Sequence, residues 1–306
     1  MTARLFAGID GGGTKTAVVV VDGSGQEIAR TVSTTSNAAV VGHEQAAAVL
    51  REVMAEAARR AGVELPFAAA WFGLSGSDRP EDHAYLRPRL ENVAAEVTMT
   101  NDAELALAGL PDRVGVAIVA GTGSISLGRN GAGEKARAGG WGHIFSDEGS
   151  GWELTRQMLR AFAAERDGRG PHSSLTDRLM AHWQIEDPFS IINRVYDPAT
   201  TKGDLAGMSR MVIEEAAKGD AVSIRILDDA AADLASLGSA VAHRLALGPE
   251  IAIALVGGLL VHVEAYRERV LHDLRQEWIV ADVTLIDDPA LTAARALATS
   301  YQGALS

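Results

Sequence analysis

The residues with the clearest chemical potential form a glycine-rich turn near the start of the chain. The segment GIDGGGTKT, residues 8–16, continues an apolar stretch and places three glycines directly after Asp10. Glycine lets backbone N–H groups approach a phosphate, and the hydroxyls of Thr14 and Thr16 can add donors. The carboxylate of Asp10 suits a hydrated Mg²⁺, which keeps several waters. A tight hairpin with Asp10 as a turn residue explains the segment equally well when it is taken alone.

A second turn, AGTGS at residues 120–124, repeats this chemistry. Gly121 and Gly123 permit close approach of a ligand to the backbone, while Thr122 and Ser124 carry hydroxyls. Neither turn is specific by itself. The occurrence of both in similar strand contexts is specific, because two such loops can hold a triphosphate from opposite sides.

Asp102 is the candidate for proton transfer. It lies in NDAELAL, residues 101–107, where a strand is expected to end and a helix to begin. A carboxylate there can accept the proton of an attacking hydroxyl. The structural alternative is that Asp102 is the N-cap of the helix, and an N-cap can also act as a base.

Two further segments have the composition of ligand-binding loops. In GGWGHIFSDEGSGWELT, residues 139–155, Asp147 offers a carboxylate to sugar hydroxyls and Trp141 an apolar wall to a sugar ring. A helix N-terminus rich in acids, with a core tryptophan, is the alternative. In VGGLL, residues 256–260, two glycines after a buried strand could admit an adenine or ribose, although a helix cap is the commoner explanation.

Alternating strands and helices must position these residues. The pattern of apolar residues predicts strands at 4–9, 16–21, 27–33, 67–73, 96–100, 114–120, 124–128, 251–256 and 282–286. It predicts helices at 43–61, 80–90, 102–109, 149–165, 204–217, 220–246, 264–277 and 290–302. The segments 8–26 and 118–134 share an outline of strand, glycine-threonine turn, strand and glycine hairpin, so each is expected to open one domain, although two unrelated glycine hairpins explain the outline equally well when it is taken alone.

Composition narrows the class of protein. A chain of 306 residues is expected to form two domains, and its net charge of −12 disfavours nucleic acid as a partner. The absence of cysteine excludes disulfides, thiolate metal sites and iron–sulfur clusters. The longest apolar stretch, residues 251–263, is shorter than the ~20 residues that span a bilayer, and no secretion signal is evident, so no membrane partner and a cytoplasmic location are expected.

Taken together, the segments resemble the N-acetylglucosamine kinase branch of the actin-like ATPases, the BadF/BadG/BcrA/BcrD type. The order of the motifs matches along nearly the whole chain. SNAAVVG (36–42) looks like the sugar-contacting segment of the family, and EEAAKGDAVSIRIL (214–227) with ALVGGLL looks like its adenosine region. The resemblance implies an α/β fold of two actin-like, ribonuclease H-like domains around a central cleft, at 1–115 and 116–288. It also implies that a helix at about 289–306 returns to the first domain, that the second domain carries a dimer surface, and that the protein is a homodimer.

The resemblance also implies residue roles. The reaction would transfer the γ-phosphoryl group of ATP to the 6-hydroxyl of an amino sugar, with Mg²⁺ held through water by Asp10 and with Asp102 as the catalytic base. Closure of the domains would exclude water. Sugar contacts are implied for Asn37, Asp102, Thr122, Gly140, Trp141 and Asp147. ATP contacts are implied for Gly12, Gly13, Thr14, Lys15, Gly121, Thr122, Gly123, Ser124, Gly257 and Gly258.

One residue departs from the family pattern, and a few alternative functions remain open. Thr292 stands where the family has glycine near its last helix, and this difference bears on packing and not on catalysis. The sugar is expected to be N-acetylglucosamine, with N-acetylmuramic acid, glucosamine and glucose as alternatives. The alternative of another class is an actin-like ATPase that acts as an activator or regulator. Activators of 2-hydroxyacyl-CoA dehydratases use cysteines, and this chain has none.

Overall fold

The computed structural model describes residues 4–76 and 79–303, which form two compact units. The N-terminal unit comprises the chain up to Arg113 together with the stretch from Ile286 onward, and the C-terminal unit comprises Val114–Leu285. Positions 1–3 of the predicted first domain and positions 304–306 of the predicted last helix lie outside the described residues.

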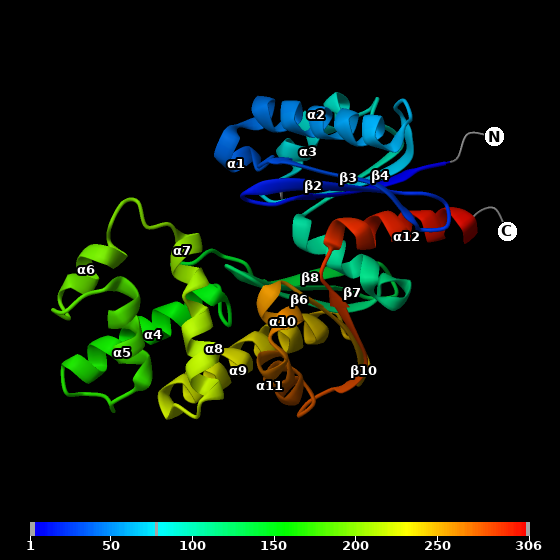
Figure 1. Cartoon of the computed structure of the whole chain (residues 1–306). Helices are drawn as coiled ribbons and strands as arrows, with labels where there is room; N and C mark the ends of the chain where they lie inside the picture. Colours follow the sequence, from blue (N-terminus) through cyan, green and yellow to red (C-terminus); the bar gives the residue numbers. More distant parts are fainter. Residues whose placement is uncertain (1–3, 77–78, 304–306) are drawn as a thin grey trace. The chain divides into compact units, whose positions relative to one another are not determined.

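A five-stranded sheet forms the centre of the N-terminal unit, with strand order β3-β2-β1-β4-β5 (Figure 1). Its strands are β1 (Phe6–Gly11), β2 (Lys15–Val21), β3 (Glu27–Thr34), β4 (Phe67–Leu74) and β5 (Ala94–Thr100). β1 pairs antiparallel with β2 and parallel with β4. The turn after β2 is closed by the Asp22 carboxylate, which accepts hydrogen bonds from the N–H groups of Ser24 and Gln26.

Helices cover both faces of this sheet. On one face lie α1 (Ala38–Val41), α2 (His43–Ala61) and α3 (Pro80–Leu86), with the short 3₁₀ helix η1 (Arg87–Arg89). On the other face lie α12 (Pro289–Gly303) and the 3₁₀ helices η2 (Asp102–Gly109) and η3 (Pro111–Arg113) (Figure 1). α12 approaches β1 so closely that a Cβ at Gly8 would collide with the carbonyl oxygen of Ala290.

Thr292, where a glycine was expected, does not make this close approach. Its hydroxyl donates to the carbonyl oxygen of Asp288, the residue just before α12, at 2.9 Å. The contact with the sheet is made by the fully buried alanines Ala290, Ala293 and Ala294. The substitution therefore leaves the packing of α12 on β1 intact.

The C-terminal unit has a second five-stranded sheet, with strand order β10-β9-β6-β7-β8. Its strands are β6 (Gly115–Ala120), β7 (Ser124–Arg129), β8 (Lys135–Gly139), β9 (Glu250–Val256) and β10 (Ile279–Ile286). β6 pairs antiparallel with β7 and parallel with β9, as β1 does with β2 and β4. The similar segments 8–26 and 118–134 thus begin equivalent sheets.

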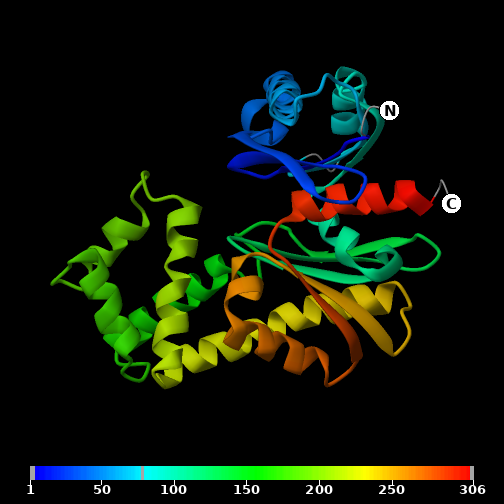
Figure 2. The same cartoon turned by 45° about the vertical axis from the view of Figure 1, so that its right-hand side comes forward.

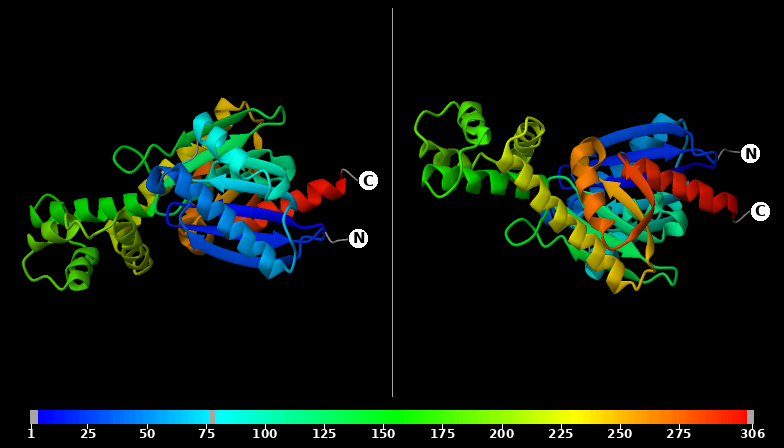
Figure 3. Two further views of the ribbon diagram at one scale, coloured as in Figure 1. Left: turned by 90° about the horizontal axis from the view of Figure 1, so that it is seen from above. Right: turned by 90° about the horizontal axis from the view of Figure 1, so that it is seen from below.

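Helices pack on this second sheet and also extend beyond it. The long α9 (Ala221–Arg244) lies against β6, β7 and β8, and α11 (Glu264–Leu274) lies beside α9. A helical cluster built around α4 (Gly151–Arg166) projects from one end of the unit in every view (Figures 1, 2 and 3). The shorter helices are α5 (Ser174–Trp183), α6 (Ser190–Val195), α7 (Lys202–Gly207), α8 (Ser209–Ala217) and α10 (Gly258–His262).

Several elements of this unit differ from expectation. The sequence did not predict β8, α5, α6 or α10, which are short and carry mixed polar and apolar residues. The single helix predicted at 204–217 is two helices, α7 and α8, which meet at Met208. None of the helices in the described part of the chain combines the length and apolarity that a bilayer crossing requires.

Candidate active site

The first glycine turn joins β1 to β2 in the N-terminal unit. A Cβ at Gly13 would meet no atom within 4 Å, so the packing of the protein does not require glycine there. The residue after β3 fixes the turn, because the hydroxyl of Thr35 donates to the Gly12 carbonyl oxygen at 2.9 Å. Thr14 and Lys15 are exposed beside these glycines. The structure therefore leaves this backbone open to a ligand.

Thr16 does not contribute the donor that the sequence suggested. The residue is fully buried, and its hydroxyl lies 2.8 Å from the Thr34 carbonyl oxygen and 2.9 Å from the Ser36 hydroxyl. That interpretation was wrong, because the alternation of β2 turns Thr16 inward, toward the same core as Val18 and Val20. Thr14 is the threonine of this turn that remains available to a phosphate.

Asp10 lies near the end of β1, opposite Ala17 on β2 and Gly73 on β4. Burial raises the pKa of Asp10 to about 6; the nearby carboxylates of Asp102 and Asp288 add to the rise, and the ammonium of Lys15 opposes it. Asp288 begins the α12 segment and forms an ion pair with Arg30 at 2.6 Å. A partly buried group of carboxylates of this kind favours a cation.

Asp102 is not the N-cap of the helix that follows β5. Asn101 is the N-cap, and its side-chain oxygen accepts a hydrogen bond from the Ala103 N–H at 2.9 Å. Asp102 is the first residue of the 3₁₀ helix η2, and its carboxylate accepts from the same N–H. The capping alternative was therefore placed one residue too late, because the sequence offers two adjacent residues that cap equally well.

Asn37 occupies a turn beside the first glycine loop. Its side-chain oxygen accepts from the Ala39 N–H at 2.9 Å and so caps α1. Its amide nitrogen lies 3.5 Å from the hydroxyl of Ser75, at the end of β4. A side chain at Gly76, which has φ +69°, would collide with this amide. Asn37 is thus held in one place, half-buried, in the same unit as Asp10 and Asp102.

The second glycine turn joins β6 to β7 in the C-terminal unit. Thr122 is exposed at its tip, and the N–H of Gly121 closes the turn on the Gly123 carbonyl oxygen at 2.9 Å. Ser124 is buried, and both its N–H and its hydroxyl already make hydrogen bonds within the protein. The N–H donates to Asp147 Oδ1 at 3.1 Å, and the hydroxyl donates to the Glu148 carbonyl oxygen at 2.6 Å. The Ser124 hydroxyl therefore fastens the turn to the 147–148 segment.

Asp147 is a buried residue that bridges two parts of this unit. Its other carboxylate oxygen, Oδ2, forms an ion pair with the Lys202 ammonium at 2.6 Å. Its backbone has φ +70°, a region that residues other than glycine rarely adopt. A Cβ at Gly123 would lie 2.7 Å from Asp147 Oδ1, so this glycine is required by the close contact.

Other contacts fix the loop that contains Asp147. The hydroxyl of the fully buried Tyr266 donates to the Gly149 carbonyl oxygen at 2.7 Å, and the Gly151 N–H donates to the Gly121 carbonyl oxygen at 2.9 Å. Burial raises the pKa of Tyr266, which keeps its hydroxyl a donor. The sequence indicated neither Tyr266 nor Lys202, because both belong to helices remote from the loop along the chain.

Trp141 lies in a different environment from Asp147. Its side chain is 63% exposed, and the Arg137 guanidinium lies 5.1 Å from the centre of its ring. Gly140 precedes it with φ +71°, and a Cβ there would lie 2.7 Å from the Ile125 side chain. The structure thus places Asp147 in a buried network and presents Trp141 to the surroundings.

Of the two glycines after β9, the packing of the protein requires a glycine at the first position only. Gly257 has φ +92° and caps α10, and a Cβ there would collide with the carbonyl oxygen of Ala120, just before the second turn. At Gly258 the nearest atom to a Cβ would be 4.0 Å away, in His262. The helix-cap explanation holds for Gly257, while Gly258 leaves open space near the second turn.

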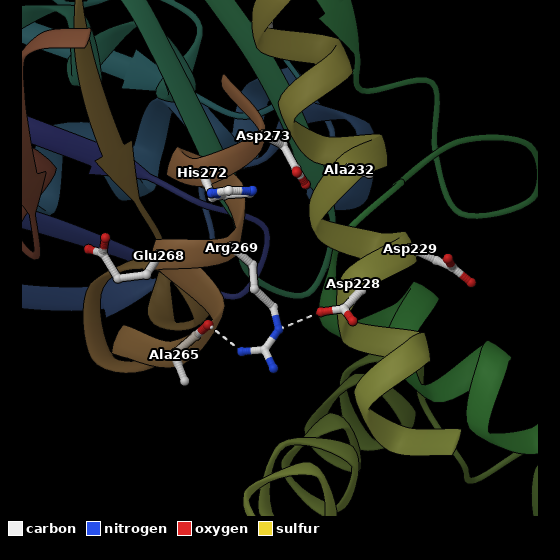
Figure 4. Close-up of a pocket in the computed structure, with 8 residues that line it drawn as sticks. All are labelled: Asp228, Asp229, Ala232, Ala265, Glu268, Arg269, His272 and Asp273. Atoms are coloured by element: carbon white, nitrogen blue, oxygen red, sulfur yellow. Dashed lines mark hydrogen bonds and ion pairs between the residues drawn. The ribbon is translucent and has the colours of Figure 1, made fainter. Parts of the chain in front are cut away.

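A separate groove between α9 and α11 is unsuited to ATP. It is lined by Asp228, Asp229, Glu268 and Asp273, and the single arginine among its lining residues, Arg269, pairs with Asp228 at 2.7 Å (Figure 4). Carboxylates on both helices repel the negative charges of a triphosphate. In the described part of the chain, no cluster of three or more His, Asp or Glu side chains is arranged to hold a metal ion.

The two sheets of this protein have equivalent strand orders, and in each of them a glycine-threonine turn joins two antiparallel strands. This arrangement defines the actin-like class of ATPases and sugar kinases. A solved structure of a candidate N-acetylglucosamine kinase from Chromobacterium violaceum matches with a TM-score of 0.71 and 25% identity, covering 97% of this chain and 99% of that one. The chain belongs to the BadF/BadG/BcrA/BcrD ATPase family, whose model matches residues 7–294.

Two curated relatives are similar to this chain over most of its length. The chain is 36% identical to the N-acetyl-D-glucosamine kinase of Dictyostelium discoideum over 296 residues, which is 92% of this chain and 91% of the relative. It is 33% identical to the N-acetylmuramic acid/N-acetylglucosamine kinase of Clostridium acetobutylicum over 265 residues, covering 85% of this chain and 87% of the relative.

Proposed function

We propose that this protein is an ATP-dependent amino sugar kinase that phosphorylates the 6-hydroxyl of N-acetylglucosamine. The observation that carries the proposal is the presence, in a member of this family, of an accessible glycine-threonine turn at equivalent strand ends of both units. Thr14 with Gly12, Gly13 and Lys15 would bind phosphate on one side. Thr122 with Gly121 and Gly123 would bind it on the other.

Asp102 would act as the general base. Phosphoryl transfer depends on positioning and on neutralisation of charge, and the attacking hydroxyl must lose a proton. Because Asn101 takes the capping role, the carboxylate of Asp102 is not needed as the N-cap. Asn37, in the same unit, would orient the sugar whose hydroxyl Asp102 deprotonates.

Asp10 fits a hydrated Mg²⁺. Such an ion is bound by one or two carboxylates plus substrate phosphates and keeps several waters, so it does not require a cage of protein ligands. A carboxylate whose pKa is raised by burial and by Asp102 and Asp288 gains from a nearby cation. When bound, Mg²⁺ would neutralise charge on the phosphates of ATP.

The sugar and the adenosine would be held mainly by the C-terminal unit. Asp147 offers lone pairs to sugar hydroxyls even while it accepts from Ser124 and Lys202, since a carboxylate has about four acceptor sites. Trp141, exposed after Gly140, would cover a sugar face. The open space at Gly258, next to Gly257, would receive adenosine.

The second candidate substrate is N-acetylmuramic acid, since one curated relative acts on both sugars. Its lactyl group needs extra room beside the sugar. We retain glucosamine as a third substrate to be tested. We do not retain the role of an activator, because the relatives are sugar kinases and the chain has no cysteine.

We further propose that the enzyme acts in the cytosol, where ATP is available.

We also propose that the enzyme is a homodimer, with a groove between α4 and α6 as the contact surface. This groove has a volume of about 490 Å³ and exposes Phe189 and Tyr196, which are 78% and 80% exposed. Leu159, Phe162, Ile191 and Ile192 line the same groove, so covering it with a second copy would remove apolar surface from water. Phe189→Asp should convert the dimer to a monomer in size-exclusion chromatography with light scattering; a wild type that is already monomeric would refute the dimer.

A coupled assay of ADP release over a panel of amino sugars tests the function. We expect turnover only with Mg²⁺ and a sugar, and ³¹P NMR should place the phosphate on the 6-hydroxyl. If ATP is hydrolysed equally fast without any sugar, the kinase proposal fails. A comparison of kcat/KM between N-acetylglucosamine, N-acetylmuramic acid and glucosamine identifies the substrate.

A further inference from the structure

The ion pair between Lys202 and Asp147 closes a ring of contacts around the second glycine turn. Lys202 is the first residue of α7, whose N-cap is Thr201. The Leu205 carbonyl oxygen of α7 accepts from the hydroxyl of the buried Thr155, on α4, at 2.7 Å. α4 begins at Gly151, whose N–H binds the Gly121 carbonyl oxygen of the turn.

The same ring returns to the turn through Asp147. One oxygen of its carboxylate accepts from Lys202 at 2.6 Å and the other accepts from the Ser124 N–H at 3.1 Å. The side chain of Asp147 is only 6% exposed, whereas that of Lys202 is 33% exposed. A cation from the helical cluster therefore reaches a buried carboxylate that directly supports the turn.

We propose that Lys202 is a positioning residue that couples the sugar-binding segment to the second glycine turn through Asp147. The inference rests on the proposed function, in which Asp147 binds sugar and the turn binds phosphate. Lys202 itself need not touch either ligand. Its ammonium compensates the charge of a buried carboxylate and holds that carboxylate in the one orientation that also bonds Ser124.

Removal of Lys202 should disturb both ligands. A buried carboxylate that loses its cation is poorly compensated, so it must turn toward water or another donor. Asp147 would then leave the Ser124 N–H, and the turn would lose one of the contacts that fix it. The expected result is weaker binding of sugar and of nucleotide together, which the loss of an ordinary sugar contact would not produce.

Lys202→Met tests this coupling. We expect the KM for N-acetylglucosamine to rise roughly 10- to 100-fold, the range expected when a hydrogen bond to a charged group is lost. The Kd for the ATP analogue AMPPNP, measured by calorimetry without sugar, should also rise. Lys202→Arg keeps the charge and should recover most of both losses, and kcat at saturating ligands should change less than either constant.

Arg178→Met is the matched control. Arg178 is 30% exposed and pairs with Glu215, which is 5% exposed, at 2.7 Å in the same unit. The substitution removes ion pairs to Glu215 and to Glu214, both away from the turn, while Glu215 keeps its pair with Lys218. It should lower the melting temperature, while leaving the sugar KM and the AMPPNP Kd unchanged.

A double-mutant cycle with Asp147→Asn decides whether Lys202 acts through Asp147. If it does, Lys202→Met should have little further effect in the Asp147→Asn background. Equal effects in both backgrounds, or an unchanged AMPPNP Kd in Lys202→Met, would overturn the inference. Failure of the wild type to phosphorylate any sugar would instead refute the proposed function, and the AMPPNP measurement would still test the link from Lys202 to the turn.

Discussion

The carboxylate of Asp102 lies close enough to Asp10 to add to the rise in the pKa of Asp10, which reaches about 6. The main cause is burial, and both causes disfavour the ionised form of Asp10. At neutral pH the protein therefore carries a charge that opposes its own folding. Residues that serve a ligand rather than stability commonly show this property.

Asp10→Asn should stabilise the protein at neutral pH. The pKa of Asp10 is higher in the folded protein than the ordinary value of 3.8, so the folded state binds the proton more tightly. The ionised carboxylate costs no stability below pH 3.8, an increasing amount between pH 3.8 and about 6, and its full amount above pH 6. Urea denaturation at pH 8 should show the variant as more stable than the wild type. A gain that is equally large at pH 4 would contradict the assignment.

Asp102→Asn should separate catalysis from folding. A positioned base contributes about 10²–10⁴-fold to rate, and the variant should lose kcat in that range. Its melting temperature should stay near that of the wild type, because Asn101 still caps η2. A folded variant that keeps more than about a tenth of the wild-type kcat would refute the role as a base.

Gly13→Ala should weaken ATP binding without a loss of stability. A methyl group at this position meets no atom of the protein, but it would stand where a phosphate must approach the backbone. Gly8→Ala is the contrasting variant, because its Cβ would collide with the Ala290 backbone. We expect a raised KM for ATP in the first and a lowered melting temperature in the second. An unchanged KM for ATP in Gly13→Ala would argue that no phosphate lies on this turn.

Glu215→Gln should destabilise the C-terminal unit in a manner that depends on pH. Hydrogen bonds from Lys218, Ser174 and Arg178 lower the pKa of Glu215 to about 2. Its contribution is therefore present above the ordinary pKa of 4.5 and is lost as the pH falls toward 2. The variant should be less stable by about 1–3 kcal/mol at pH 7, the usual range for weakening hydrogen bonds to a charged group, here the buried Glu215 carboxylate. In thermal melts followed by circular dichroism, the difference between variant and wild type should shrink at acid pH.

The turns and the strand ends could be predicted because their signals are local. Asp10, the glycines and Asp102 lie at or just after the end of a short apolar strand, and the repeated outline at 8–26 and 118–134 predicted that each segment opens a domain. The hydroxyls of Thr16 and Ser124 were harder to place, because donor chemistry does not show which face of a strand a residue occupies. The alternation of Thr16 with Val18 and Val20 was the available signal.

The contacts around Asp147 could not be predicted, because they depend on segments far apart in sequence. Lys202 lies 55 positions from Asp147, and Tyr266 lies 117 positions from Gly149. Asp288 reaches the surroundings of Asp10 only because the last helix returns to the first strand. The spacing of apolar residues predicts one helix or strand at a time. It does not indicate which helix supplies a cation or a hydroxyl to a loop that is distant in sequence.

The return of α12 to β1 has a consequence for biosynthesis. The face of the N-terminal sheet around Gly8 is covered by alanines of α12, which the ribosome makes only after the whole C-terminal unit. Until then the part of that face contacted by α12 stays uncovered, although η2 already lies on the same face, while the C-terminal unit has all of its own elements. The unit translated first is thus completed last, and synthesis of this protein includes a long interval in which that face needs protection from other chains.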